Sequence, residues 1–502
     1  MSKGNHFVKI AVLGSYSIQF LVEKLKKVNP DLDIFEGTYL QIEKYFFGDD
    51  NSLFDFNPDF IIIHDTTLSF KQKFFHYKKG SFSETQIDRL KAMIECIILK
   101  NPNSKIIYPN LDQDNEMNFG NYYFKTPNSI DFQLNIYNYQ LSKLALKYEN
   151  LFILDINNLI FRFGIARDRR LVISSDLHFT PSFTEKLALS INKLIYALNG
   201  HFIKCIITDL DNTLWGGSIG EDGLEGIKLG NFGIGKAFTD FQFWLKSLKD
   251  RGIILCVCSK NQEKIAKEPF HKHPDMVLKL KDIAVFISNW KNKADNIRYI
   301  KNILNIGYDS IAFLDDNPFE RDLVKKSIEK IVVPEMPEDP SLFKSFLIDQ
   351  NLFEMSSFSS LDTERTEYFQ REGLKRRIGK SYYNINSHLK SIKMEATVEG
   401  ISEKNISRMT QLVQRTNQFN ARTIRHSEAS IRNILNDPNY YSFCFGLFDN
   451  FGSHGIVAFV ILHKKRDDSV FINTFLMSCR VFERGLEYFA IDFIKLFLTK
   501  KK

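Results

Sequence analysis

The sequence predicts a multidomain α/β protein. Three observations support this prediction. The chain has 502 residues, short apolar strands alternate with amphipathic helices up to about residue 340, and a helix–strands–helix pattern begins near residue 385. Single hydrophobic cores stop growing at roughly 250–300 residues, so we expect about two to four domains. Alternating strands and helices are typical of parallel sheets that are covered on both faces.

The elements divide the chain into four predicted regions. The first, residues 1–200, holds apolar strands at 8–15, 59–65, 105–110 and 151–157, with the clearest helices at 17–28, 85–100 and 184–198. A second α/β domain is expected over 201–340, ending in the Pro- and acid-rich PEMPEDP. A polar helical connector (341–384) leads to an α+β domain (385–502), with helices at 402–419 and 487–498 and strands at 440–449, 456–463 and 470–479.

Composition indicates a soluble, cytoplasmic protein. Hydrophobic residues make up 44% of the chain and charged residues 25%, which is ordinary for a globular protein. The six cysteines include no CxxC pair, which favours reduced thiols over disulfides or zinc. No stretch approaches the roughly 18–20 apolar residues of a membrane span, and the N-terminal apolar run is too short for a signal peptide.

The net charge of +7 comes from scattered lysines rather than from a basic block. Because arginines and aromatic residues are not clustered, the sequence predicts no nucleic-acid partner. A lysine-rich solvated surface explains the charge, and an anionic metabolite or an acidic carrier protein would also suit its sign.

Two carboxylates stand at the end of the apolar run in KCIITDLDNTL. An Asp at the carboxyl end of a parallel strand lies at the edge where open α/β sheets bind ligands. Asp209 and Asp211 are two residues apart, so an extended backbone would place both side chains on one face. One acid could act as a nucleophile and the other as a general acid/base, with Mg²⁺ bringing a phosphate dianion close.

Three further motifs follow in order, each at or after a predicted strand. IILCVCS ends in Ser259, NWKNKADNI offers Lys293 with Lys291 as the alternative, and SIAFLDD ends in the pair Asp315–Asp316. Together with TDLDNTL, they resemble the four motifs of the haloacid dehalogenase superfamily. One such motif alone is a weak signal, whereas four in the correct order are specific.

The resemblance implies a role for each of these residues. Asp209 would be the nucleophile and a Mg²⁺ ligand, Asp211 the general acid/base and a further metal ligand, and Asp315 would complete the metal site. Ser259 would hold the phosphoryl group, and Lys293 would neutralise charge between Asp209 and the phosphate. Residues expected to bind the substrate or its phosphate are Thr213, Asn261, Asp316 and Asn317.

The intervals between the motifs hold one crossover helix each and a short Gly-rich flap, GGSIGEDGLEG. They leave no room for the large cap domain that encloses small substrates in many relatives. An open site suits a bulky substrate, or a substrate that another domain presents.

Finer details resemble the FkbH-like proteins, the subfamily IIIC phosphatase-like group. The motifs that carry this resemblance are DLDNTLWGG, IGEDG, CSKN, FLDDNPFER, VVPEMPEDP, QRTNQFNARTIR, FDNFGSHGIV and MSCRVFERGLE. The resemblance implies transfer of a glyceryl unit from 1,3-bisphosphoglycerate, or a related phosphorylated three-carbon donor, to an acyl carrier protein with release of phosphate. Two alternatives are a plain phosphatase acting on a small phosphorylated metabolite and a scaffold that binds carrier proteins without chemistry.

Acyl transfer of this kind needs a thiol, because thiolates are strong acyl nucleophiles. Cys258 immediately precedes Ser259 and is the preferred thioester carrier, and Cys479 is the second candidate. Both could equally be packing residues, because Cys is among the most buried residue types. Neighbours on a strand also point to opposite faces, so Cys258 and Ser259 need not share the site.

The C-terminal region resembles acetyl-CoA-binding acyltransferases of the GNAT class, in which a Gly-rich loop and a helix N-terminus hold the pyrophosphate. Glu487 stands where a second glycine is usual, which argues against ordinary acetyl transfer. Binding of a phosphopantetheine arm is predicted instead, at Cys479, Arg480, Arg484 and Gly485. Nearby polar side chains that could contribute, or could equally cap helix ends and loops, are Asn417, Gln418, Asn420 and Arg422.

The N-terminal region resembles an SGNH-hydrolase or flavodoxin-like sheet. LGSYS occupies the place of the nucleophile motif, and SSDLHFTP is similar to the terminal Asp/His block, with Asp176-x-His178 instead of the usual D-x-x-H. Ser15, or alternatively Ser17, could form a hydrolytic pair with His178. A non-catalytic domain that positions partners is the preferred interpretation.

Overall fold

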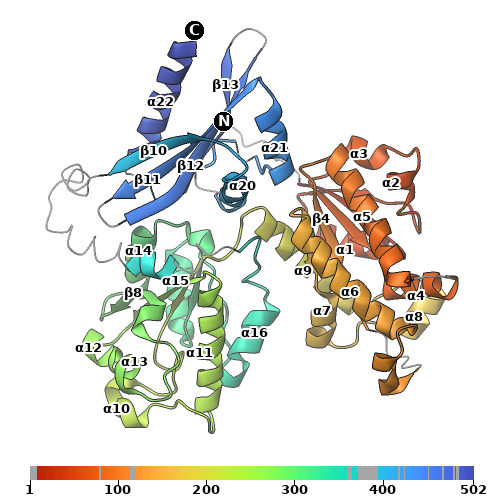
Figure 1. Cartoon of the computed structure of the whole chain (residues 1–502). Helices are drawn as coiled ribbons and strands as arrows, with labels where there is room; N and C mark the ends of the chain where they lie inside the picture. The colour runs from red at the N-terminus through yellow and green to blue at the C-terminus, as the bar shows by residue number, and fades with distance from the viewer. Residues whose placement is uncertain are drawn as a thin grey trace. The chain divides into compact units, whose positions relative to one another are not determined.

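The computed structural model describes residues 8–77, 81–113, 119–358, 365–370, 394–416, 419–422, 424–449, 452–465, 469–478, 481 and 485–501. Within these ranges the chain contains two parallel sheets and one antiparallel sheet (Figure 1). It divides into two compact units, Met1–Ile195 with Arg425–Asn436, and Tyr196–Ile424 with Asp437–Lys502. A mixed α/β multidomain fold is therefore confirmed. Among the described helices, none has the length and apolar character needed to cross a bilayer.

The first unit is built on a five-stranded parallel sheet in the order β2-β1-β3-β4-β5. All residues of β3 and β4 are buried, because helices cover both faces, and these strands are therefore uninterrupted apolar runs. The sequence predicts every strand except β2, an edge strand with a single buried residue and hence a weak apolar pattern. The strands are β1 (Val8–Gly14), β2 (Leu32–Glu36), β3 (Phe60–His64), β4 (Lys105–Pro109) and β5 (Leu151–Leu154).

Helices of the first unit include one that is distant in sequence. The segment around α21 (Glu428–Asn436) belongs to this unit, where the Ser427 hydroxyl donates to the carbonyl of Pro102 at 2.7 Å. The other helices are α1 (Gln19–Val28), α2 (Lys44–Phe47), α3 (Ser52–Phe56), α4 (Thr67–Phe75), α5 (Phe82–Lys100), α6 (Ile130–Lys147), α7 (Ile156–Phe163), α8 (Arg169–Ser175) and α9 (Pro181–Leu198).

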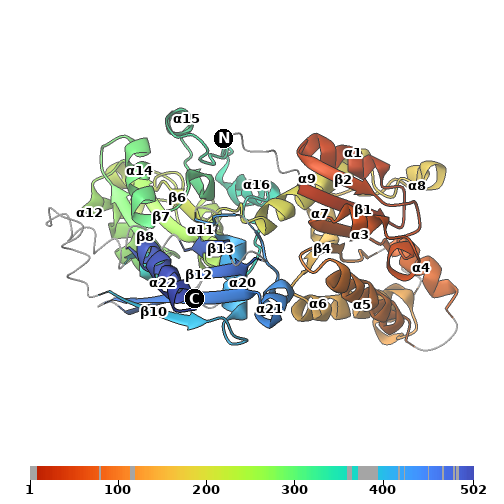
Figure 2. The ribbon, with the colours of Figure 1, turned by 90° about the horizontal axis from the view of Figure 1, so that it is seen from above.

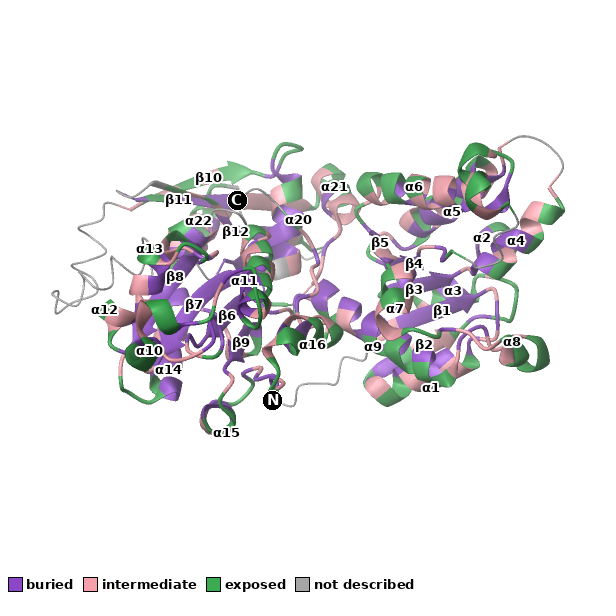
Figure 3. Cartoon of the chain, turned by 90° about the horizontal axis from the view of Figure 1, so that it is seen from below, coloured by how far each residue is buried: buried purple, intermediate pink, exposed green. Residues whose placement is uncertain are grey.

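The second unit contains a four-stranded parallel sheet in the order β8-β7-β6-β9. Its strands are β6 (Cys205–Thr208), β7 (Ile254–Ser259), β8 (Ile283–Ser288) and β9 (Ile311–Leu314). Alternate residues of the strands pack into two cores. Ile206 and Val257 pack with side chains of α11 (Gly235–Asp250), whereas Ile207 and Cys258 pack with those of α14 (Lys293–Leu304). Figure 2 shows these two helices on opposite sides of the sheet, and Figure 3 shows its strands as buried.

Helices lie between these strands and after the last of them. The helices are α10 (Ile219–Gly226), α11 (Gly235–Asp250), α12 (Glu263–Ala266), α13 (Glu268–Lys272), α14 (Lys293–Leu304), α15 (Pro318–Ser327) and α16 (Phe343–Asp349). Residues 201–340 are all described, and they contain no inserted cap domain. The predicted connector over 341–384 begins with α16, and most of its remainder lies outside the described residues.

The third sheet is antiparallel, in the order β10-β11-β12-β13. The sequence predicts its three longer strands and misses β10, a mostly exposed edge strand. The elements are β10 (Glu395–Gly400), α20 (Ile406–Arg415), β11 (Tyr440–Asp449), β12 (Gly452–Lys464), β13 (Val470–Met477) and α22 (Leu486–Lys501). The helix–strands–helix pattern is thus confirmed, while the more specific GNAT-like assignment stays a prediction, as does the SGNH-like assignment of the first sheet.

Candidate active site

The carboxyl edge of the second parallel sheet gathers the predicted motif residues. Asp209 directly follows β6, Asp315 directly follows β9, and Ser259 is the last residue of β7. Because β6 pairs with both β7 and β9, these three strand ends are neighbours. All three side chains are buried. The local strand pattern and the sheet order together therefore build the site.

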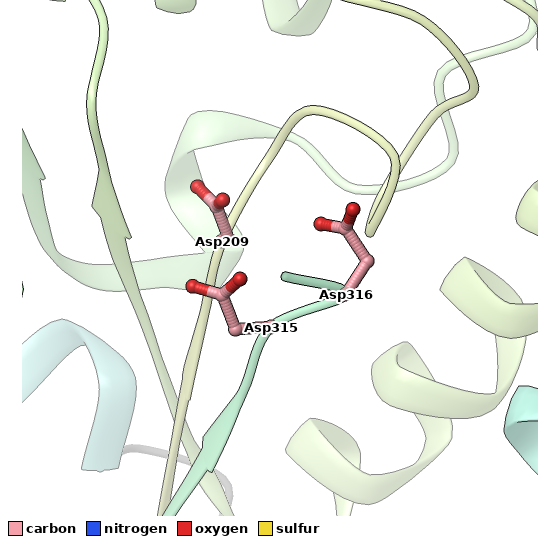
Figure 4. A group of neighbouring side chains, drawn as sticks. All are labelled: Asp209, Asp315 and Asp316. Atoms are coloured by element: carbon pink, nitrogen blue, oxygen red, sulfur yellow. The ribbon is translucent and has the colours of Figure 1, made fainter. Parts of the chain in front are cut away.

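Three acids form one group at this edge. Carboxylate oxygens of Asp209, Asp315 and Asp316 all lie within 4.8 Å of one another, and Figure 4 shows the three side chains around a common space. Within the described residues, the buried Oδ1 of Asp209 has no hydrogen-bond partner. A buried oxygen without a partner is unfavourable, and hard divalent cations bind carboxylate oxygens, so this group suits a metal such as Mg²⁺.

Lys293 links two of these acids. Its Nζ lies 2.7 Å from Oδ2 of Asp209 and 2.5 Å from Oδ2 of Asp315. Burial alone would lower the pKa of the Lys293 ammonium, but the charges of the two carboxylates outweigh burial and raise it. Lys293 begins α14, whereas the alternative Lys291 is exposed in the preceding loop. The structure therefore places Lys293 in the site and Lys291 outside it.

Burial changes the acid strength of two members of the acid group, Asp315 and Asp316. Burial raises the pKa of Asp315 to about 7, and the negative charge of Asp209 adds to the rise while Lys293 opposes it. Burial likewise raises the pKa of Asp316. A proton on Asp315 would compete with a metal for its oxygens, because a metal ligand must be deprotonated.

The loop after β9 is held by its neighbours. The Thr213 hydroxyl donates to Oδ1 of Asp316 at 3.0 Å, and the Asn317 amide donates to Oδ1 of Asp315 at 2.9 Å. The side chain of Asn317, which the sequence predicted to bind phosphate, caps the N-terminus of α15. Arg321, which the sequence reasoning missed although it lies in the motif FLDDNPFER, donates to the main-chain carbonyls of Asp315 and Asp316.

Asp211 has a different environment from the three acids. Its Oδ1 accepts from the indole Nε1 of Trp215 at 2.9 Å and from the amide of Ile219 at 3.1 Å. Its Oδ2 accepts from Nδ2 of Asn261 at 2.9 Å and from the Ser218 hydroxyl at 3.3 Å. The carboxylate lies outside the acid group, in which Asp316 appears instead. This arrangement differs from the predicted side-chain ligand set, because Trp215 and the flap direct Asp211 elsewhere.

The prediction that Cys258 carries an acyl group does not fit the structure. Cys258 is fully buried among apolar side chains beneath α14, and its Sγ faces the carbonyl of Lys293 at 3.8 Å. Burial raises the pKa of the Cys258 thiol well above its usual range, so it is a poor source of thiolate. The side chain of the neighbouring Ser259 points to the opposite face of the sheet, and its Oγ lies 3.4 Å from Nδ2 of Asn261.

Most of the predicted pantetheine-binding residues belong to segments that the structure does not describe. Cys479, Arg480 and Arg484, together with Asn417 and Gln418, lie outside the described residues.

Three of the C-terminal candidates are described. Gly485 has a φ of +81°, a conformation that favours glycine, directly before α22. Asn420 forms an isolated bridge with Leu476 of β13, and the Arg422 guanidinium lies 5.0 Å from the centre of the Phe471 ring. A pantetheine site here stays a prediction.

The described contacts do not join a serine of the N-terminal sheet to His178. The Ser15 hydroxyl lies 3.2 Å from that of Thr66, and the Ser17 amide donates to Asp176 at 3.2 Å. Nε2 of His178 instead faces the guanidinium of Arg167 at 3.0 Å. Burial, together with the charge of Arg167, lowers the pKa of His178 to about 2, which does not suit a general base.

Comparison with known proteins found one family and one solved structure that are similar to this chain. The family described as FkbH, N-terminal domain, matches residues 9–197. A solved structure is also similar to this chain. It is the crystal structure of the N-terminal part of a protein from Bacteroides fragilis, which contains a phosphatase domain and is complexed with Mg. It is 38% identical, the match covers 70% of this chain and 95% of that one, and the TM-score is 0.67. The search of curated proteins gave no match.

Fold and site together define a haloacid-dehalogenase-like phosphatase domain, in which strand-end acids gather at the carboxyl edge of a parallel sheet. The chain belongs to the FkbH-like family.

Proposed function

We propose that this protein is a Mg²⁺-dependent phosphoryl-transfer enzyme, and that it uses phosphate release to drive transfer of a glyceryl or related acyl unit to an acyl carrier protein. The observation that carries the phosphoryl chemistry is the contact of Lys293 with Asp209 and Asp315 beside an oxygen that has no partner. Family membership and the phosphatase domain of the Mg-complexed relative support the same chemistry.

Asp209 is the proposed nucleophile. An oxygen of its carboxylate attacks phosphorus, the bond from phosphorus to the leaving oxygen breaks, and the phosphoryl group is left on Asp209. Asp211 supplies the proton that an alcohol leaving group requires and afterwards takes a proton from the water that releases inorganic phosphate. Lys293 and Ser259 hold the transferring group through charge and a hydroxyl contact. Mg²⁺, held by Asp209, Asp315 and Asp316, would neutralise charge between these carboxylates and the phosphate.

The acyl step is assigned to the carrier's own thiol. The thiol of Cys258 is buried, and the described part of the site therefore offers no thiolate of its own. An acyl phosphate such as 1,3-bisphosphoglycerate reacts readily with a thiolate, forming the thioester as the bond from the acyl carbon to the phosphate oxygen breaks and the first phosphate leaves. The Asp209 site then removes the remaining 3-phosphate, whose leaving oxygen is the alcohol that Asp211 protonates, and the glyceryl thioester results. The absence of a cap insertion within residues 201–340 leaves the site open to a substrate attached to a carrier.

Intact-mass analysis tests this proposal. The full chain is incubated with 1,3-bisphosphoglycerate, Mg²⁺ and a phosphopantetheinylated acyl carrier protein, and free phosphate is measured in parallel. A glyceryl adduct on the carrier together with phosphate release is the expected result. Phosphate release without an adduct would contradict acyl transfer and leave the plain phosphatase. Neither product would contradict both, and the scaffold interpretation would then hold.

Metal dependence gives a further expected result. Chelation with EDTA abolishes phosphate release, and Mg²⁺ restores it. Because burial raises the pKa of Asp315 to about 7, protons compete with the metal below that pH. The rise in melting temperature on adding Mg²⁺ is therefore larger at pH 8 than at pH 6, as differential scanning fluorimetry would measure.

Two variants control this measurement. Asp315→Asn removes one acid of the group and is expected to lose the Mg²⁺-dependent rise in melting temperature. Asp240→Asn removes an exposed carboxylate that is not one of the motif residues. This carboxylate pairs with Lys344 at 3.0 Å, and the variant should respond like the wild type. An equal rise for Asp315→Asn and the wild type would show that the metal binds elsewhere.

A further inference from the structure

The carboxylate of Asp211 receives four hydrogen bonds, which fall into two classes. Two donors belong to buried side chains, Trp215 and Asn261, at 2.9 Å each. The other two belong to the flap, where the Ser218 hydroxyl lies at 3.3 Å and the Ile219 amide at 3.1 Å. A carboxylate offers about four lone-pair sites, and these four donors occupy them; the Ser218 hydroxyl can accept as well as donate, so it is the contact at which Asp211 can hold a proton.

The two buried donors are rigidly placed. Trp215 is completely buried, and its ring packs edge-on against Phe270 with ring centres 6.0 Å apart. Asn261 is 5% exposed, and its main-chain carbonyl accepts from the Ser288 hydroxyl at 2.9 Å. An indole has one N–H and no acceptor, so the Trp215 contact has a single possible direction. A buried indole N–H normally needs a partner, and Asp211 is the partner here.

Asn261 also connects Asp211 to the phosphoryl-holding side of the site. Its Nδ2 lies 2.9 Å from Oδ2 of Asp211 and 3.4 Å from Oγ of Ser259. One amide group therefore sets the spacing between the side chain proposed to move protons and the hydroxyl proposed to contact the phosphoryl group.

We propose that Trp215 and Asn261 are positioning residues that hold the Asp211 carboxylate in the orientation needed for proton transfer. This proposal rests on the proposed function, in which Asp211 gives a proton to the leaving oxygen as its bond to phosphorus breaks. Two fixed donors, one on each oxygen, leave the carboxylate little freedom to rotate. Proton transfer depends on such alignment, because the proton must pass over a hydrogen-bond distance.

Leaving-group dependence distinguishes positioning from a general loss of structure. An alkyl phosphate such as glycerol 3-phosphate needs a proton on its leaving oxygen, whereas p-nitrophenyl phosphate does not. Trp215→Phe keeps an aromatic ring and loses the N–H. It is expected to lower kcat/KM, which covers only the steps up to formation of the phosphoaspartate, by about 10- to 100-fold for the alkyl phosphate and by less than about threefold for p-nitrophenyl phosphate.

The chain offers a matched control in Trp244. Its ring stacks on Phe241 and packs against Phe353, and Trp244→Phe removes an indole without touching Asp211. This control should leave the ratio of the two kcat/KM values unchanged. Asn261→Ala serves as an independent second variant, because Asn261 lies in a loop rather than in the apolar core. Since Asn261 also contacts Ser259, this variant is expected to lower kcat/KM for both substrates, with the larger loss for the alkyl phosphate.

Asp211→Asn separates the possible failures. If it lowers kcat/KM equally for both substrates, Asp211 is not the acid, and the proposed function and this inference fail together. If Asp211→Asn is selective for the alkyl phosphate while Trp215→Phe and Asn261→Ala are not, the proposed function holds and only the positioning role is overturned. Equal losses on both substrates in Trp215→Phe and Asn261→Ala would also overturn positioning.

Discussion

Asp209→Asn is expected to abolish phosphate release, with kcat for p-nitrophenyl phosphate falling by about 10³-fold or more. An amide is a far weaker nucleophile than a carboxylate, and it also weakens the acid group that we propose binds the metal. Lys293 keeps its contact with Asp315 at 2.5 Å in this variant, so the fold should persist. Steady-state kinetics and circular dichroism measure the two effects.

Trapping the intermediate makes the same prediction sharper. Wild-type protein that is quenched in acid during turnover should carry one phosphoryl group by mass spectrometry, and Asp209→Asn should carry none. Asp240→Asn, which alters an exposed ion pair with Lys344, is the matched control and should behave as the wild type does. Normal turnover by Asp209→Asn would contradict the assignment of the nucleophile.

Lys293→Met is expected to remove activity and also to destabilise the fold when metal is absent. The ammonium is buried and contacts two carboxylates, so its loss leaves Asp209 and Asp315 without a counter-charge. Breaking a buried ion pair by removing one partner typically lowers stability by about 3–5 kcal/mol. Urea denaturation at pH 8 without Mg²⁺ measures this loss.

The pH dependence of that loss has a definite sign. The pKa of Asp315 is already raised to about 7, and removing a neighbouring cation raises it further. A folded-state pKa above the unfolded value means that stability falls as pH rises through the interval between them. The variant should therefore be less impaired at pH 5 than at pH 8, and Mg²⁺ should restore part of its stability at pH 8.

Lys344→Met provides the comparison for this variant. Lys344 forms an exposed ion pair with Asp240 at 3.0 Å, of a kind that contributes at most about 1 kcal/mol. A loss of similar size in Lys293→Met and Lys344→Met would contradict the view that the buried lysine compensates two site carboxylates.

Several parts of the site follow from local sequence rules. Apolar runs in the sequence predicted β6, β7 and β9. A polar residue ends or follows each run and therefore lies at a strand end: Asp209, Ser259 and Asp315. Parallel strands place these ends on one edge, so the gathering of the motifs could be predicted without coordinates. The predicted phosphatase-like domain agrees with the similar structure.

The strands that the sequence did not predict, β2 and β10, are two of the edge strands. In β2 and β10 few residues are buried, and an apolar pattern requires a buried face. The association of α21 with the first unit also had no local signal, because it depends on packing between residues far apart in sequence, such as Pro102 and Ser427.

Side-chain direction was decided only by tertiary structure. The spacing of Asp209 and Asp211 predicted a shared face, but the chain leaves the strand at Thr208, and Trp215 and Asn261 hold Asp211 away from the acid group. The alternation of side chains along a strand allowed Cys258 to point either into the site or into the core. Its packing beneath α14 shows that it points into the core. By itself the sequence determined which residues reach the sheet edge, because strand ends are local. Only the packed structure decided what each residue contacts there, because those partners come from other elements.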